Sequence, residues 1–186
     1  LSNASKVRDV GALLRETCGD GQPAKFKLHN VEHHQAHLAS SFFVSPFDSA
    51  AVVSVDGFGD FVSGMWGTGR GGKIEVKDQV EFPHSLGLFY LALTQYLGFP
   101  NYGDEYKVMG LAPYGEPELI DEMRKIVRLL PGGRYELDLD CFVHHSEGVT
   151  MVWDDGSPTI GTVFSEELAK RLGPPRGKDE AVGDRH

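Results

Sequence analysis

The spacing of apolar residues predicts an alternation of short helices and strands along the first third of this 186-residue chain. Valines and leucines three and four positions apart predict a helix over 7–18, ended by one of the glycines that follow. Alternation of Phe26 and Leu28 with lysines predicts a short, half-buried strand. Helical spacing returns over 32–43, so a second helix is expected there.

The middle of the chain carries its most apolar segments. The continuous run Ala50–Val55 predicts a buried central strand that stops at Asp56. Two further strands are expected over 61–82, joined by a glycine-rich turn at 69–72. The most apolar helix is predicted over 85–97, followed by a loop, a short helix and another loop.

The last third predicts two helices separated by two strands. An amphipathic helix begins near Pro117 and ends before Pro131. Strands are expected over 134–145 and 149–153, and a final helix begins after Ser165 as its N-cap. This order of elements predicts the α/β class, with a mixed sheet.

Charge and composition argue against some classes of partner and bear on the location of the protein. The formal net charge of −9 argues against a nucleic-acid or anionic-membrane surface. No apolar run is long enough to span a bilayer, and the start shows no signal-peptide pattern. Cys18 and Cys141 lie far apart without a CxxC motif, which predicts reduced thiols and a cytoplasmic location. Residues 1–4 include the "SNA" typical of a tag scar, so one folded unit is expected over 5–186.

Three histidines crowd into the head of the second predicted helix. Residues four apart share a helix face, so His33 and His37 are able to point at one metal ion. His34 points about a quarter-turn away, which indicates a supporting or structural role. Neutral imidazole suits zinc, iron, nickel or copper. The metalloprotease motif H-E-x-x-H needs a glutamate where His34 stands, so this chain lacks that motif. The alternative to metal binding is that the histidines face solvent or satisfy helix-end groups.

A turn whose residues are candidates for binding an anion or a metal follows the predicted central strand. In "VSVDGFGD" the backbone around Gly57 and Gly59 is able to form an anion-binding concavity. Asp56 or Asp60 would then hold a metal or a water. The alternative is a simple β-hairpin turn, because an Asp-Gly pair is also a strong hairpin signal.

The stretch 101–115, "NYGDEYKVMGLAPYG", has too little apolar content for a core. Lys107 is a candidate phosphate contact, and Asp104 or Glu105 a candidate partner for ribose hydroxyls beside Gly103. A solvated connection is the alternative. Three other histidines show no comparable spacing and are expected on the surface or in strands: His84, His144 and His145.

These stretches in this order resemble a known family. "EHHQAHLASSFF", "VSVDGFGD", "YGDEYKVMGLAPYG" and "LGPPR" are similar to the amino-terminal domain of O-carbamoyltransferases, the group that contains nodulation-factor and tobramycin carbamoyltransferases. The resemblance covers nearly all of the chain from about Lys25. The same fold relates this group to the hydrogenase-maturation carbamoyltransferase and the tRNA threonylcarbamoyladenosine enzymes.

The resemblance implies an actin/hexokinase/Hsp70-like lobe, part of a larger two-lobed domain. It implies that a His-x-x-x-His pair, here His33 and His37, binds iron or zinc. The family's chemistry activates carbamoyl phosphate with ATP to give carbamoyl-adenylate and passes the carbamoyl group to the hydroxyl of a small molecule or an oligosaccharide. His33, His37 and Asp56 are thereby expected to be catalytic. The expected nucleotide-binding residues are Gly57, Gly59, Asp60, Gly103, Asp104, Glu105 and Lys107.

The resemblance also implies missing parts. Family members are several times longer, with a separate domain that makes the adenylate, and their third metal ligand is an aspartate far downstream. We therefore expect a piece of a larger enzyme that binds metal weakly and transfers no carbamoyl group by itself. Two alternatives stay open: a sugar-kinase-like or ATPase piece of the same fold, in which Asp56 serves phosphoryl transfer, and a non-catalytic metal-binding or docking module.

Overall fold

The computed structural model describes residues 10–18, 26–154 and 157–183, which fall into two units, 1–32 and 33–186. In the first unit, α1 (Val10–Cys18) confirms the predicted helix. The strand predicted around Phe26 and Leu28 is wrong, because 26–32 has no regular structure and these side chains are 43% and 48% exposed. A strand needs a neighbour for its backbone hydrogen bonds, and the described part of this unit offers none. The glycines after α1 and residues 1–4 lie outside the described residues.

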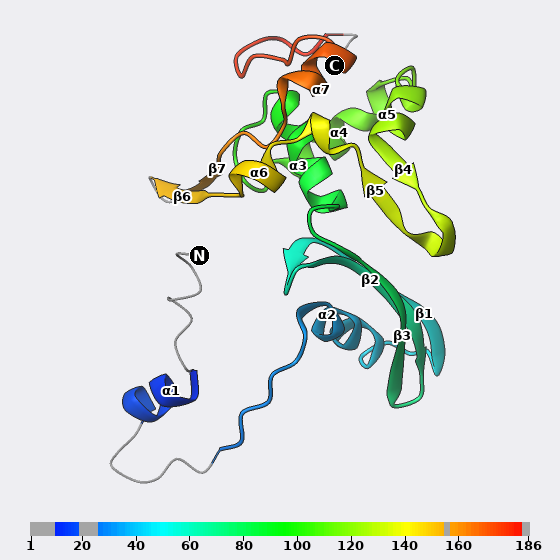
Figure 1. Cartoon of the computed structure of the whole chain (residues 1–186), viewed down its shortest axis with the longest axis vertical. Helices are drawn as coiled ribbons and strands as arrows, with labels where there is room; N and C mark the ends of the chain where they lie inside the picture. The colour runs from blue at the N-terminus through cyan, green and yellow to red at the C-terminus, as the bar shows by residue number, and fades with distance from the viewer. Residues whose placement is uncertain (1–9, 19–25, 155–156, 184–186) are drawn as a thin grey trace. The chain divides into compact units, whose positions relative to one another are not determined.

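The second unit begins with α2 (His33–Phe42), which lies against a three-stranded sheet (Figure 1). The sheet is built from β1 (Ser49–Gly59), β2 (Val62–Arg70) and β3 (Lys73–Glu81), in the order β1-β2-β3. All its pairs are antiparallel because consecutive strands are joined by tight turns. The helix over 32–43 and the turn within 69–72 are confirmed.

Two predictions about this sheet are wrong. The described sheets are all antiparallel, so a mixed sheet is not formed by the described residues. The run Ala50–Val55 forms an edge strand, not a central one, and only its α2-facing side is buried. Val52 is 6% exposed, whereas Val53 and Val55 are 66% and 54% exposed. The central position belongs to β2, which has hairpin partners on both sides.

The contact between α2 and the sheet depends on a glycine. A Cβ at Gly69 of β2 would lie 2.6 Å from the ring of Phe42, so only glycine lets this end of α2 approach. The buried apolar side chains between helix and sheet form one cluster: Leu38, Phe42, Val52, Val62 and Met65.

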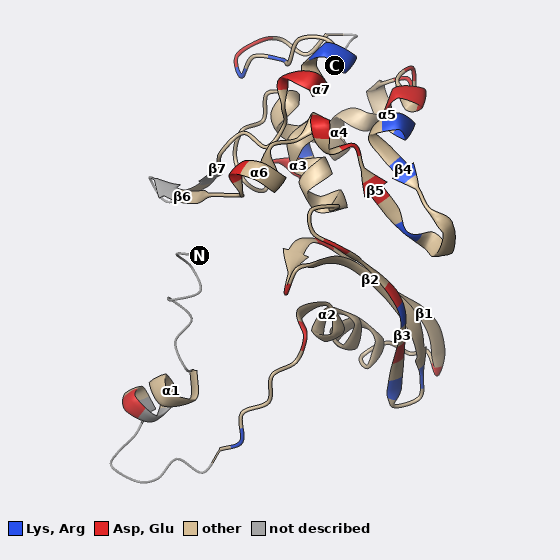
Figure 2. Ribbon diagram, viewed as in Figure 1, with Lys and Arg blue, Asp and Glu red and all other residues tan. Residues whose placement is uncertain are grey.

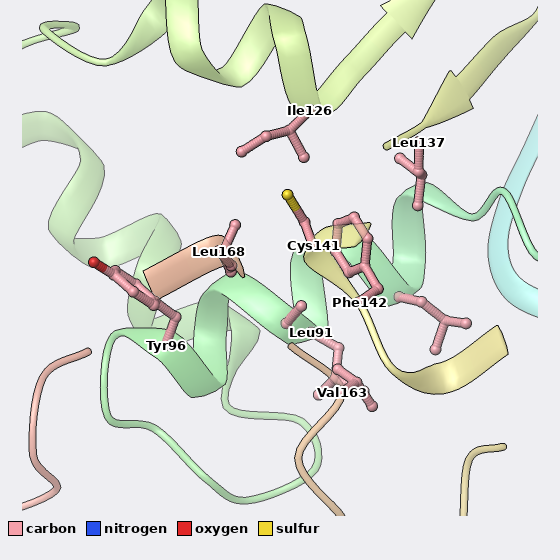
Figure 3. Packing of buried hydrophobic residues seen from close by; sticks show 10 residues of the cluster. Leu91, Tyr96, Ile126, Leu137, Cys141, Phe142, Val163 and Leu168 are labelled. Carbon is pink, nitrogen blue, oxygen red and sulfur yellow. The ribbon is translucent and has the colours of Figure 1, made fainter. Parts of the chain in front are cut away.

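A second buried cluster surrounds α3 (Leu86–Tyr96), the apolar helix predicted over 85–97. Ser85 is its N-cap and accepts the backbone N–H of Leu88. Figure 3 shows side chains from α3, α7 (Glu166–Leu172) and the intervening segments meeting in this cluster. Its buried members are Leu88, Leu91, Ala92, Tyr96, Ile126, Leu137, Cys141, Phe142, Val163 and Leu168. The predicted Ser165 N-cap of α7 is confirmed, because its side chain accepts the Glu167 N–H.

The remaining elements are short. The short helix predicted between two loops is α4 (Glu105–Leu111), and η2 (Ala112–Tyr114) follows it. The amphipathic helix predicted from Pro117 is shorter than expected, because after α5 (Ile120–Ile126) the chain pairs as β4 (Val127–Leu129) with β5 (Tyr135–Leu137). The elements still to be named are η3 (Pro131–Gly133), η4 (Leu139–Cys141), α6 (His144–Glu147), β6 (Met151–Asp154) and β7 (Ser157–Ile160).

Charged side chains are spread unevenly over these elements (Figure 2). Helix α5 carries two acid–base pairs three residues apart, Asp121–Arg124 and Glu122–Lys125. Helix α2 has no aspartate, glutamate, lysine or arginine, so its histidines are its only ionisable side chains. Among the described residues, no helix combines the length and apolarity needed to cross a membrane.

Candidate metal centre

Two histidines of α2 and one aspartate of β1 converge. The Nε2 atoms of His33 and His37 are 3.0 Å apart. The Oδ2 atom of Asp56 lies 3.0 Å from His33 Nε2 and 3.4 Å from His37 Nε2. One ligand atom from each residue thus lies within 4.8 Å of the other two. Side chains 23 positions apart in sequence are brought to a single point.

Local structure accounts for each of these positions. Helical spacing places His33 and His37 one above the other on α2. Alternation along β1 places Asp56 on the same face as Val52 and Ser54, the face that α2 covers. The three donors therefore meet where the first turns of α2 lie next to the last α2-facing residues of β1.

His34 is structural, as its predicted direction indicated. Its side chain is fully buried, and its Nε2 lies 2.8 Å from the carbonyl oxygen of Val62, to which it donates. Its Nδ1 lies 2.8 Å from the Ser54 hydroxyl, which makes Nδ1 the acceptor in the neutral ring. His34 thus ties α2 to both β1 and β2.

His33 is held by two residues of the hairpin that joins β1 to β2. Asp60 Oδ2 accepts the backbone N–H of His33 at 3.0 Å. A Cβ at Gly59 would lie 2.2 Å from Cγ and Cδ2 of the His33 ring, so the ring rests directly on the backbone there. The reversal itself falls at Asp60 and Phe61, whose φ angles are +50° and +65°. A hairpin does form in this stretch, but its reversal lies at Asp60 and Phe61 and not at the Asp56–Gly57 pair that suggested it. The nucleotide roles of Gly57, Gly59 and Asp60 stay predictions.

Asp56 is an ionised ligand candidate. The hydrogen bond from His33 lowers the pKa of Asp56, against partial burial, which raises it; the backbone N–H of Gly57 lowers it further. That N–H donates to Oδ1 at 2.6 Å, which leaves Oδ2 turned toward the histidines. The Gly57 N–H is therefore engaged by its neighbour's carboxylate.

A cleft of about 510 Å³ includes Asp56 in its lining, but neither His33 nor His37. Asp56 and Gly57 line it from β1, and Tyr102 and Glu105 line it from the start of the stretch 101–115. Asp56 thus borders a cleft as predicted, and the beginning of 101–115 borders the same one. The Tyr90 hydroxyl, also in this wall, donates to the carbonyl of Glu105 at 3.0 Å.

Asp104 and Lys107 are partners of each other. Lys107 Nζ lies 2.7 Å from Asp104 Oδ1, and this hydrogen bond raises the pKa of Lys107. The Asp104 side chain is nearly buried and also accepts the Asn101 N–H at 3.2 Å. Gly103, with φ of +90°, makes the turn into α4. The predicted nucleotide contacts of these residues and of Glu105 stay predictions.

The surface-or-strand assignment is wrong for His144, and His84, which is half-buried, lies in no strand either. His144 is neither on the surface nor in a strand: it begins α6, is fully buried, and its Nε2 donates to the Pro83 carbonyl at 2.8 Å. Burial lowers the pKa of His144. His84 is half-buried, and its Nδ1 accepts the Leu137 N–H at 3.1 Å. His145 is exposed, as predicted.

Two imidazoles and one carboxylate are a donor set that proteins use for catalytic zinc and iron, with coordination positions left open for substrate. The atoms at His33, His37 and Asp56 fit such an ion, because all three face one point. The three residues are therefore a candidate set of ligands for a transition metal. Residues 15–155 match the family described as carbamoyltransferase N-terminus, and the chain belongs to that family.

Several curated proteins are similar to this chain. An uncharacterized protein of Synechocystis is 39% identical over 151 residues, 81% of this chain and 22% of that protein. Nodulation protein NolO of Bradyrhizobium diazoefficiens is 45% identical over 113 residues, 59% of this chain and 20% of that protein. Nodulation protein NolNO of Sinorhizobium fredii is 41% identical over 133 residues, 70% of this chain and 19% of that protein. The matched part is thus about a fifth of each relative's length.

Proposed function

We propose that this chain is the metal-holding part of an O-carbamoyltransferase, folded as an actin/hexokinase/Hsp70-like lobe. The enzyme would activate carbamoyl phosphate with ATP as carbamoyl-adenylate and pass the carbamoyl group to a substrate hydroxyl. The observation that carries the proposal is the convergence of His33, His37 and Asp56 within 4.8 Å in a member of the carbamoyltransferase N-terminus family.

The donor set favours iron or zinc. Magnesium, the ion of phosphoryl transfer, prefers an oxygen shell, whereas two of the three donors here are imidazole nitrogens. This is why we propose carbamoyl transfer in preference to a kinase or ATPase reaction. When bound, iron or zinc would polarise the carbamoyl carbonyl and offset phosphate charge in the transition state.

The residues of this chain would orient the transfer. The acceptor hydroxyl oxygen forms a bond to the carbamoyl carbon, the bond from that carbon to the adenylate oxygen breaks, AMP leaves with the electron pair, and the hydroxyl proton is released. The cleft that Asp56 borders offers about 510 Å³ for the reacting groups. Glu105 is the proposed partner of ribose hydroxyls, because it lines the same cleft as Asp56.

We propose further that transfer needs sequence beyond these 186 residues, since the relatives matched are about three to four times as long. Transfer requires the adenylate, a fixed metal and a positioned acceptor, and its rate depends on holding all three together. The 186 residues alone are expected to consume no carbamoyl phosphate in the presence of ATP. Turnover by the isolated chain would contradict this.

Metal titration tests the centre directly. Zn²⁺ titrated into the chain by calorimetry, or Co²⁺ followed by its visible absorption, should show one site. Replacing His33, His37 or Asp56 with alanine should weaken binding at least tenfold, since each removes one of three ligands. His145→Ala, which removes an exposed histidine elsewhere, should leave binding unchanged. Tight binding that survives the double replacement of His33 and His37 would place the ion elsewhere.

The activity is tested in the longest natural polypeptide that contains this sequence. His37→Ala should abolish carbamoyl transfer to a hydroxyl while leaving carbamoyl phosphate-dependent pyrophosphate release from ATP, because the metal acts in the second step. The two steps are assayed separately. Normal transfer by the His37→Ala enzyme would refute the mechanism.

A further inference from the structure

Asp56 lies on the α2-facing side of β1, but its backbone has no regular ladder partner on β2. Strand β1 pairs with β2 up to Val55 opposite Gly64 and again at Gly59 opposite Val62. Three β1 residues, 56–58, therefore stand opposite the single β2 residue Ser63. Such a bulge interrupts the ladder hydrogen bonds that would otherwise fix a strand residue. Something outside the β1–β2 ladder must hold Asp56 within reach of the histidines.

The first turn of α3 makes that contact. The Ser85 hydroxyl lies 2.5 Å from the Gly57 carbonyl oxygen, to which it donates, and 3.2 Å from that of Asp56. The Ser85 hydroxyl oxygen also accepts the Leu88 N–H at 3.0 Å and so caps α3. Ser85 is fully buried, so water does not compete for these bonds. One side chain thus joins the start of α3 to the bulge.

Gly87 brings the helix against the same backbone. A Cβ at this position would lie 2.6 Å from the Asp56 carbonyl oxygen and 2.6 Å from the Gly57 nitrogen. Both atoms belong to the bulge backbone, which cannot swing aside as the end of a flexible side chain does. Only glycine permits this approach.

We propose that Ser85 and Gly87 are positioning residues for the metal centre: the first turn of α3 sets where the Asp56 carboxylate stands relative to His33 and His37. This rests on the proposed metal-binding function. A methyl group at Gly87 forces the bulge and the first turn of α3 apart by about 0.8 Å, from 2.6 Å to the 3.4 Å at which ordinary contact begins. Asp56 Oδ2, now 3.0 Å and 3.4 Å from the two Nε2 atoms, would leave the common point.

The test compares two glycine-to-alanine variants of the 186-residue chain. Gly87→Ala adds a methyl group against the bulge, whereas Gly110→Ala adds one on α4, where nothing lies within 4 Å. Zn²⁺ affinity is measured by calorimetry and folding by thermal melting. Gly87→Ala should bind at least tenfold more weakly, the usual effect of disturbing a ligand's support. Gly110→Ala should bind as the parent does.

A second pair acts through the hydroxyl. Ser85→Ala should weaken Zn²⁺ binding at least tenfold, and Ser85→Thr, which keeps the hydroxyl, should retain most of the affinity. This pair decides the matter if Gly87→Ala shows no cooperative melting. Parent-like affinity in a folded Gly87→Ala or Ser85→Ala variant would overturn the proposal.

A metal-free readout separates this proposal from the proposed function. The ring ¹⁵N resonances of His33 and His37 report the contact with Asp56 without any ion. They should shift in Gly87→Ala and stay unchanged in Gly110→Ala; unchanged rings in Gly87→Ala would overturn the positioning role. Failure of the parent chain to bind Zn²⁺, with shifted rings in Gly87→Ala, would overturn the metal centre but not the positioning of Asp56.

Discussion

Replacing His34 with alanine is expected to destabilise the chain without affecting the metal ligands directly. In the structure this ring is fully buried and bridges the Ser54 hydroxyl and the Val62 carbonyl, each at 2.8 Å. Alanine leaves both partners without the ring, inside the contact between α2 and the sheet. The neighbouring His37→Ala is the matched control, because that side chain is half exposed.

The size of the expected destabilisation follows from the two polar groups that lose their hydrogen-bond partner. A buried polar group left without its partner costs about 1–3 kcal/mol, so two of them cost about 2–6 kcal/mol before any cavity is counted. Loss of a half-exposed ring such as His37 changes stability by about 0.5 kcal/mol or less. With a urea dependence of about 2 kcal/mol per molar, the middle of the usual range, the His34 variant should unfold at a midpoint lower by about 1–3 M.

Urea unfolding of metal-free protein, followed by far-ultraviolet circular dichroism, measures both variants on one scale. Equal midpoints for His34→Ala and His37→Ala would refute the structural role of His34. Zn²⁺ titration supplies the reverse comparison, since His37→Ala should lose binding. A stable His34→Ala variant that loses Zn²⁺ as His37→Ala does would make His34 a ligand in place of a structural residue.

Two further predictions concern glycine contacts and pH. Gly59→Ala should weaken Zn²⁺ binding at least tenfold, because its methyl group would overlap the His33 ring. Gly57→Ala, whose Cβ meets nothing within 4 Å, should bind Zn²⁺ far more tightly than Gly59→Ala. Equal affinities of the two variants in calorimetry would contradict the packing of His33 on Gly59. Burial lowers the pKa of His144, so its contribution to stability is present above the unfolded value of about 6.5 and is lost as pH falls through the folded pKa. His144→Gln should flatten the loss of stability on acidification below about pH 6.5, and His145→Gln should not; thermal melting across this range would expose the opposite ranking.

Local spacing was enough to predict that two of the three converging side chains share one face. His33 and His37 share a face on any helix, and the apolar positions after them specify that helix. The approach of Asp56 depends on which face of β1 is covered by α2, and spacing along one strand does not specify its partner. Alternation along β1 does place Asp56 on the same face as Val52. This would have located Asp56 if the face of β1 that α2 covers had been known.

The position of β1 in the sheet was not predictable from apolar content. Val53 and Val55 suggested burial on both faces, yet they are exposed in the structure. The strand that occupies the centre contains Gly67, whose Cβ would lie 2.2 Å from the Glu75 carbonyl oxygen. Close backbone approach, and not apolar content, marks this central strand. His144 was misassigned for a similar reason, because a polar side chain with one good carbonyl partner can be buried.

The two rims of the three-stranded sheet differ in what they present to an added strand. Strand β3 carries exposed charges at Lys73, Glu75 and Lys77, the kind of side chain that discourages strand addition at a sheet edge. From Ser49 to Val55, β1 carries no charged residue. Extension of this sheet therefore has a preferred direction, outward from β1. Among the described residues no strand pairs with the outer edge of β1, so we expect concentrated protein to associate first at this edge.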